Sequence, residues 1–271
     1  MTARRIGLVA WHVLKQNIRD RVLYTIVAFA LLLVGASLAI AQITAGQDLK
    51  IIKDLGLAAI ELGGVLMSVF IGVSLVADEI DRRSIVPVLA KPLPRWEFIV
   101  GKYAGLVLTI GINVAALTGA LYLMLLWMGS TAAANVRLSW EAPATDPRLM
   151  IAVILITAEL ALLTAIALFF STFSSSAMLS AALTVGLFIA GVESDALRQF
   201  TRTVDAPALG RVVSAAGWIV PAFSIFDVKA EVVHGLPIPA ARIGLALTYA
   251  AVYIAVAVGA AVLIFSRREF R

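Results

Sequence analysis

Long apolar runs alternate along the chain with short segments that hold most of its charged residues. A helix needs about 20 apolar residues to cross roughly 30 Å of hydrocarbon, and six runs reach this length. An α-helix satisfies its own backbone hydrogen bonds within lipid, so the pattern predicts an all-α integral membrane protein with six transmembrane helices. The predicted spans are residues 22–43, 57–77, 103–128, 149–170, 173–192 and 243–265.

Two further segments show helical features outside these runs. Over residues 6–18 apolar side chains recur at helical spacing, so residues 1–21 are predicted to form an amphipathic helix on the cytoplasmic membrane surface. Residues 193–242 mix polar and apolar positions and include an apolar string at 215–223 that contains Gly217 and Pro221. For this external segment we expect a short re-entrant or surface-lying helical element rather than a seventh crossing.

Positive charge predicts the orientation, because Lys and Arg gather in short cytoplasmic segments. With both termini inside, the external loops hold only Lys50, Lys53, Arg137 and Arg148, apart from the long 193–242 stretch, which is too long to weigh strongly. The internal segments hold Arg4, Arg5, Lys15, Arg19, Arg21, Arg82, Arg83, Lys91, Arg95, Lys102, Arg267, Arg268 and Arg271. Both termini are therefore expected in the cytoplasm.

The composition supports one membrane domain over residues 1–271. Hydrophobic residues make up 61% of the chain and charged residues 14%, against about a quarter charged in soluble domains. The net charge of +5 is explained by topology, and no nucleic-acid partner is expected. With no cysteine and two histidines, the chain has no disulfide, thiolate metal site or cysteine nucleophile, and we expect no metal.

The segment between the second and third predicted spans, residues 78–102, has a more regular sequence pattern than a flexible linker needs. An acidic cluster closes the second span, the apolar stretch 85–89 follows, and Pro92 and Pro94 turn the chain before the third span. This pattern predicts a short helix presented to the cytoplasm, in a shape suited to docking on another protein. The simpler alternative is a solvated helix end whose acidic residues pair with Arg82 and Arg83.

Here the chain resembles the permease subunits of type-2 ABC exporters, in particular the multi-copper-enzyme-maturation and multidrug permease group. In this family an acidic residue ends the second span, and a small-residue-plus-aliphatic run, a Pro-x-x-Arg-like turn and a Gly-Lys pair follow. The matching positions are Glu79, residues 84–89, residues 92–95 and Gly101-Lys102. The outline of the whole chain also matches. Pro87 departs from the family pattern, so the helix is expected to begin near residue 86.

The resemblance implies that this helix is the coupling helix for a separate cytoplasmic ABC ATPase, present in two copies. The chain itself lacks the G-x-x-x-x-G-K-[ST] phosphate loop, so it is expected to be no enzyme and to bind no cofactor, with ATP acting through the partner. A second permease copy, identical or related, would complete the export pathway in the cell (inner) membrane. The implied coupling residues are Glu79, Asp81, Arg82, Arg83, Ser84, Ile85, Val88, Leu89 and Arg95.

Two polar residues lie within the predicted spans. Glu159, near the middle of the fourth span, could line a substrate path or make an interhelical hydrogen bond as a neutral acid, and the second interpretation is preferred. Asn113 in the third span is a further candidate intramembrane polar position. In the same span, small residues at 101, 105, 111, 115 and 119 would permit close approach of another helix.

Two other function classes compete with an ABC permease. An ATP-independent carrier or structural membrane subunit is one alternative, although repeated halves with broken midplane helices are not found. An intramembrane enzyme is the other, but the sequence has no G-x-S-x-G, no H-E-x-x-H and no histidine within a predicted span. No side chain selects among lipids, glycans, drugs or peptides as the substrate.

Overall fold

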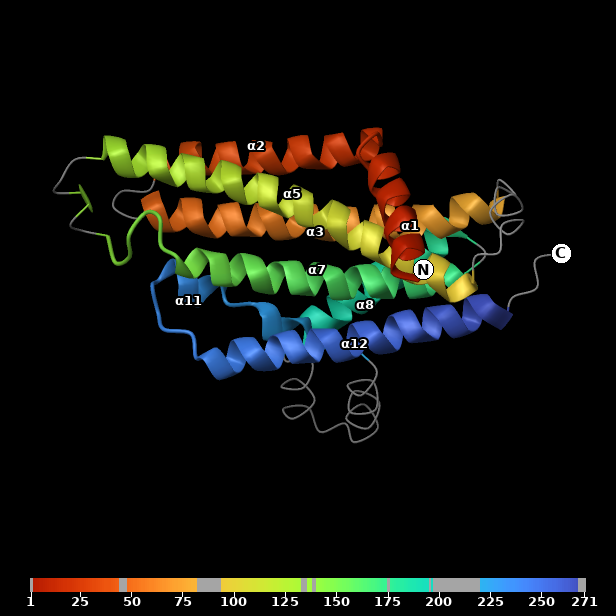
Figure 1. Ribbon diagram of the computed structural model, residues 1–271. Helices are drawn as coiled ribbons and strands as arrows, with labels where there is room; N and C mark the ends of the chain where they lie inside the picture. The colour runs from red at the N-terminus through yellow and green to blue at the C-terminus, as the bar shows by residue number, and fades with distance from the viewer. Residues whose placement is uncertain are drawn as a thin grey trace.

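The computed structural model describes residues 2–43, 48–81, 94–132, 136–137, 140–174, 176–194, 196 and 220–267. In this part of the chain the regular structure is entirely helical, and the long helices form one elongated bundle (Figure 1). The elements are α1 (Thr2–Asn17), α2 (Arg21–Ile43), α3 (Asp48–Asp81), α5 (Arg95–Thr131), α7 (Arg148–Phe173), α8 (Ala177–Val192), the 3-10 helix η1 (Phe223–Phe226), α11 (Lys229–Val233) and α12 (Ala240–Arg267).

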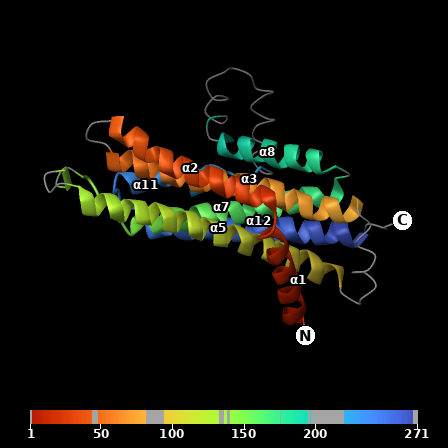
Figure 2. The ribbon, with the colours of Figure 1, turned by 90° about the horizontal axis from the view of Figure 1, so that it is seen from above.

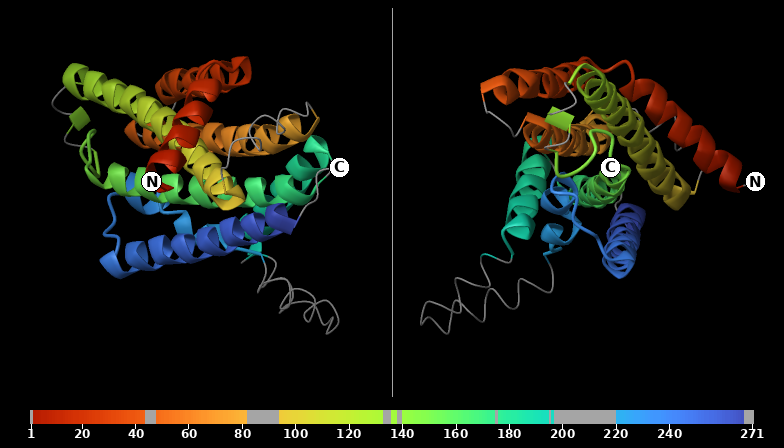
Figure 3. Two further views of the ribbon diagram at one scale, coloured as in Figure 1. Left: turned by 45° about the vertical axis from the view of Figure 1, so that its right-hand side comes forward. Right: turned by 90° about the vertical axis from the view of Figure 1, so that its left-hand side faces the viewer.

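Helix α7 is the centre of the bundle. It contacts α3, α5, α8 and α12, and these neighbours surround it when the bundle is viewed nearly along its axis (Figure 3, right). Its sequence is apolar on nearly every face, as expected of a helix that other helices largely surround, although Met150 and Ile154 are exposed. Most of its side chains are buried, and Leu155, Leu160 and Leu163 are fully inaccessible.

Helices α3 and α7 run in the same direction and approach closely. A Cβ at Gly64 would overlap the side chain of Leu160, and one at Gly72 would lie 2.8 Å from the Cβ of Ala167. Small residues at such points let two helix backbones come near each other. The contact also fixes the level of each residue along the bundle, so Glu61, one turn before Gly64, lies at the level of residues 157–160.

Among the described residues, four helices are long and apolar enough to cross a membrane: α3, α5, α7 and α12. Two shorter apolar helices, α2 over Leu23–Ala39 and α8, lie beside them. The outer helices expose large apolar side chains such as Leu32, Val256 and Leu263. Because water would not solvate these faces favourably, they suit contact with lipid.

Helix α1 lies across the bundle rather than along it (Figures 1 and 2). It packs on α5, leaves the bundle on the side opposite α8 (Figure 2), and buries Ala10, Val13 and Leu14. Leu8 and Trp11 are exposed on its outer face. We call the end of the bundle where α1, Asp81, Arg95 and Arg267 lie the α1 end, and the opposite end the α11 end.

The described part of the fifth-to-sixth connection is embedded in the bundle. Residues 220–239 include η1 and α11, which pack against α3, α7 and α8 and lie between α8 and α12 (Figure 3, right). Phe223, Phe226 and Val232 are buried, and a Cβ at Gly191 would overlap Phe223 and the carbonyl of Pro221. The apolar string predicted at 215–223 is described only from residue 220 onward.

Five of the six predicted spans lie within single helices that are longer than the spans, whereas the span predicted at 173–192 begins at the last residue of α7 and ends in α8. Helix α3 begins before residue 57, and α5 begins at Arg95, so the connection between them is shorter than 78–102. The placement of Phe173 in the fifth span was wrong, because this residue ends α7 and α8 begins at Ala177. Apolarity marks the part of a helix suited to lipid, whereas hydrogen bonding continues the helix into polar surroundings.

Candidate functional site: the α1 end and a buried polar cluster

Three of the nine predicted coupling residues, Glu79, Asp81 and Arg95, lie at the α1 end. Glu79 and Asp81 lie in the last turn of α3, and Arg95 is the first residue of α5. The side chains of Glu79 and Asp81 lie outside the described part. So do the six remaining positions, Arg82, Arg83, Ser84, Ile85, Val88 and Leu89.

Arg95 joins the start of α5 to the end of α12. Its guanidinium Nη1 donates hydrogen bonds to the backbone carbonyls of Ser266, at 2.9 Å, and Phe265, at 3.4 Å. These carbonyls lie in the last turn of α12, where a cation also interacts favourably with the helix dipole. The rings of Phe98 and Phe265 stack beside this contact with centroids 5.9 Å apart. The two helix ends are therefore held as one unit.

The same end of α5 carries α1. The Cβ positions of Gly101 and Gly105 face Val9 and Val13 at 2.7 Å, so only glycine permits this approach. At the end of α1, the side-chain amide of Asn17 donates to Thr109 Oγ1 at 3.2 Å. Of the small residues noted in the sequence, 101 and 105 serve this contact, while positions 111 and 119 meet no atom within 4 Å.

Two charged residues near this contact are buried. Glu97 is 3% exposed, and its Oε2 lies 3.8 Å from Arg5 Nη1 on α1. Lys102 is 1% exposed, with its Nζ 4.7 Å from the centroid of the Phe98 ring. Sequence reasoning noted Lys102 as part of a motif and as one of the internal positive charges, but not as a buried residue, and it missed Glu97. The available signal was a carboxylate and an ammonium placed within an apolar helical run.

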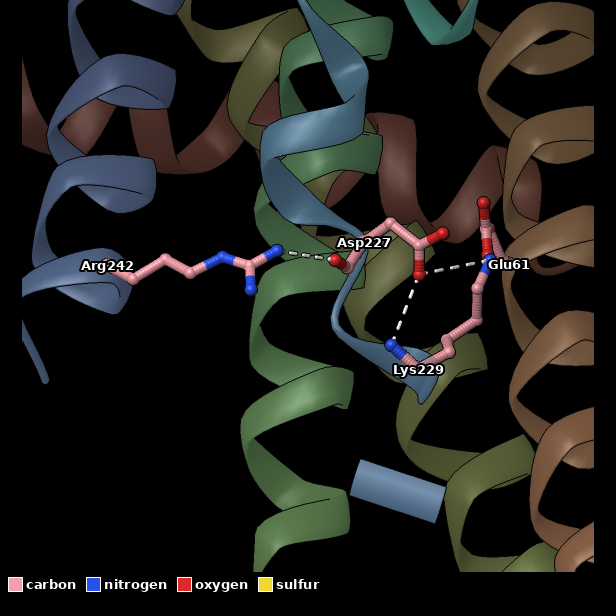
Figure 4. Close-up of polar contacts among 4 residues, drawn as sticks. All are labelled: Glu61, Asp227, Lys229 and Arg242. Atoms are coloured by element: carbon pink, nitrogen blue, oxygen red, sulfur yellow. Dashed lines mark hydrogen bonds and ion pairs between the residues drawn. The ribbon is translucent and has the colours of Figure 1, made fainter. Parts of the chain in front are cut away.

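A second group of charged residues lies inside the bundle toward the α11 end. Lys229 of α11 extends to Glu61 of α3 and donates a hydrogen bond to its Oε2 (Figure 4). Both side chains are about four-fifths buried, with 21% and 20% exposed. Glu159 of α7 is 3% exposed and lies close enough to Glu61 and Lys229 to interact electrostatically with both. These charged side chains therefore lie where α3, α7 and α11 meet.

Asp227 and Arg242 complete this cluster. Asp227 Oδ1 accepts a hydrogen bond from the Lys229 backbone N–H at 3.1 Å and lies 3.8 Å from its Nζ. From the opposite side, Arg242 of α12 donates to the Asp227 carbonyl at 2.9 Å (Figure 4) and also pairs with Glu231. Hydrogen bonds and ion pairs therefore connect residues 227–231 to both α3 and α12.

Electrostatic effects in the connection are consistent with firm pairing. Burial lowers the pKa of Lys229, but the hydrogen bond to Glu61 and the charges of Glu61 and Asp227 outweigh burial, so the pKa lies above its ordinary value. Burial, the largest single effect, raises the pKa of Glu231, but the hydrogen bond with Arg242, a backbone hydrogen bond and the charge of Arg242 together lower it by more, so the net shift is downward. Both groups are charged over the physiological pH range.

The two intramembrane polar positions singled out in the sequence lie in different places. Glu159 belongs to the charged cluster, and no interhelical hydrogen bond from its side chain is present among the described residues. Asn113 is half-buried on α5 and donates to the Thr109 carbonyl of the same helix at 2.7 Å, a common way to satisfy a polar group within lipid. Nothing brings Asn113 and Glu159 together in the described part of the chain.

Sequence reasoning missed Lys229, Asp227 and Arg242 as partners of a membrane helix. The signal was weak, because these residues stand in a segment of mixed polarity that resembles an ordinary surface loop. Among the described residues, no group of three or more His, Cys, Asp or Glu side chains has the geometry of a metal site.

Comparison with known proteins identifies the family. A search of curated proteins gave no match. The family model of the ABC-2 family transporter protein matches residues 8–270, which is nearly the whole chain. The match agrees with the apolar helical bundle and with the motifs around residues 79–102. The chain therefore belongs to the ABC-2 transporter family and is a multi-pass membrane permease of the type-2 ABC class.

Proposed function

We propose that two copies of this permease and two copies of a separate cytoplasmic ABC ATPase form an exporter in the cell (inner) membrane. The chain would cross the membrane six times, with the α1 end in the cytoplasm. ATP would be bound and hydrolysed by the partner, and this chain would bind no cofactor and catalyse no reaction. Membership of the copper-enzyme-maturation or multidrug subgroup stays a prediction, as does the choice between an identical and a related second permease.

The observation that carries this proposal is the architecture of the α1 end. Helices α3 and α5 have 34 and 37 residues, about 51 and 55 Å at 1.5 Å per residue, well beyond the roughly 30 Å of hydrocarbon. In Figure 1 both helices continue past α1. If α1 lies on the membrane surface, their ends extend into water, and residues 82–93 connect two rigid helices there.

The contacts of Arg95 support a mechanical role for this end. Its bonds to the last turn of α12 and the stacking of Phe98 on Phe265 link α5 to α12, and α1 is fitted against α5 at Gly101 and Gly105. A force applied by an ATPase to the connection would therefore reach three helices together. This is the arrangement that coupling of ATP hydrolysis to transport requires.

The test uses charge changes in the connecting segment. Glu79→Lys and Leu89→Asp change positions that the proposed topology assigns to the cytoplasm, so they should leave the permease inserted and folded. An unpaired charge buried in a docking groove costs about 1–3 kcal/mol or more, so ATPase binding should weaken about tenfold or beyond. Leu236→Asp provides a matched control, because Leu236 is exposed at the α11 end.

The measurement is co-purification of the ATPase with full-length tagged permease, followed by transport-linked ATP hydrolysis in liposomes. We expect both connection variants to lose the partner or the coupling and Leu236→Asp to keep both. If the two connection variants bind and couple as the unmodified permease does, the docking site is elsewhere and the proposed coupling helix is wrong.

A further inference from the structure

The charges of Glu61, Glu159 and Lys229 do not balance if both carboxyl groups are ionised. Lys229 is bonded to Glu61, which leaves Glu159 as a second carboxyl group with no hydrogen-bond partner in the described part of the chain. Glu159 is almost fully buried, with 3% of the residue exposed. An unpaired carboxylate at such a place is costly, whereas a neutral carboxylic acid costs much less.

The surroundings of Glu159 offer no other cation among the described residues. Helix α3 contributes Glu61, the connection contributes Asp227 and Lys229, and α8 contains no ionisable residue. Arg242 of α12 is already engaged by Glu231 and by the Asp227 carbonyl.

The nearby tyrosines also have their own contacts. On α5, Tyr103 donates its hydroxyl proton to the Ala161 carbonyl at 3.2 Å. On α12, the Tyr249 hydroxyl accepts the Ala222 N–H at 2.8 Å, and the Tyr253 ring packs against Tyr249. Glu159 is therefore left with Lys229 as the one nearby ammonium in this part of the structure, and Glu61 already holds it.

We propose that Glu159 is a proton-binding site, and that Glu61, Glu159 and Lys229 together hold one proton that moves between the two carboxyl groups. In one state the proton is on Glu159 and Lys229 pairs with ionised Glu61, which is the pairing that the structure contains. In the alternative state the O–H bond of Glu159 breaks, the proton passes to Glu61, and the ammonium of Lys229 pairs with Glu159. The inference concerns the permease itself and does not depend on ATPase docking.

The exchange suits a site within a membrane because the total charge of the three groups is unchanged. Each state contains one ammonium, one carboxylate and one carboxylic acid, so no net charge is created in a medium of low dielectric constant. Glu61 is the more accessible carboxyl, at 20% against 3% for Glu159, so it can exchange its proton with water. Movement of Lys229 would shift α11, and with it residues 227–231, relative to α3 and α7.

Infrared spectroscopy of the full-length permease in lipid nanodiscs tests the site, because a protonated carboxyl group has its own C=O stretching band. The unmodified protein should show such a band, and Glu159→Gln should lose it. Glu61→Gln should lose it as well, although Glu159 is still present, because Lys229 then takes ionised Glu159 as its partner. Asp227→Asn is the control and should retain the band.

A double variant separates this chemistry from simple misfolding. Glu61→Gln combined with Lys229→Met removes the only reason for Glu159 to ionise, so the band should return. Persistence of the full band in Glu159→Gln, or in a folded Glu61→Gln protein, would overturn the proposal. If Glu61→Gln does not fold, the double variant and Glu159→Gln decide the test. The band must then be present in the double variant and absent from Glu159→Gln. Any other result rejects the proton-binding site.

Discussion

The contact of α1 with α5 depends on Gly105, and replacing it with alanine should loosen α1 while leaving the rest of the bundle intact. A Cβ at this position would lie 2.7 Å from the Ala10 carbonyl oxygen and 2.7 Å from the Val13 Cβ. Carbon atoms in favourable contact are about 3.5–4.0 Å apart. The obstruction includes backbone, so α1 must withdraw by about 1 Å rather than change a rotamer.

Gly111→Ala isolates the cost of this withdrawal. Gly111 lies on the same helix and has no atom within 4 Å of its Cβ position. Both substitutions gain about 1 kcal/mol of helix propensity, so this gain cancels when the two variants are compared. Overpacking costs about 1–3 kcal/mol. The difference between the variants should therefore be about 1–3 kcal/mol, all of it at the α1 contact.

Hydrogen exchange of the α1 amides measures this difference. If α1 exchanges by local opening, its amides should exchange between about fivefold and about a hundredfold faster in Gly105→Ala than in Gly111→Ala. Amides of α7 should be unaffected in both variants. Equal protection of α1 in the two proteins would refute the close contact and its proposed energetic role.

Three further predictions follow from the connection and the topology. Gly191→Ala should lower the thermal midpoint, because the new Cβ would overlap the Pro221 carbonyl and the Phe223 side chain. Gly186→Ala should leave the midpoint unchanged, because no atom lies within 4 Å of its Cβ position. The pKa of Glu231 is lowered in the folded state, so the stabilisation from its pair with Arg242 is present above the ordinary pKa of about 4.3 and is lost as the pH falls through the lowered value. Thermal midpoints measured below about pH 5 should show this loss, and Glu231→Gln should reduce the slope. Single cysteines at Ser84 and Asp205 in this cysteine-free chain should react with impermeant reagent from opposite sides of the membrane, and labelling from one side would refute the six-span topology.

The sequence predicted the helices because a chain segment within lipid can adopt few backbone structures. A long apolar run must satisfy its backbone hydrogen bonds internally, so five of the six predicted spans lie within single helices and nearly all of the remaining one lies in α8. The periodicity of residues 6–18 likewise predicted α1, and the motifs around residues 79–102 indicated the family that the comparison confirmed. The exact helix limits did not follow, because composition marks the hydrocarbon and not the last hydrogen bond of a helix.

The partners of the polar groups were decided only by the tertiary structure. Glu61 and Lys229 are separated by 168 positions in the chain, and no local pattern connects them. The packing of α11 against α3 brings them together, and the overlap of Gly64 with Leu160 places Glu159 at the same level. The sequence also does not distinguish the surroundings of one glycine from those of another, although the Cβ position of Gly105 meets α1 and that of Gly111 faces open space. Apolar burial in a membrane determines that a helix forms, whereas shape and charge across several helices determine which side chains meet.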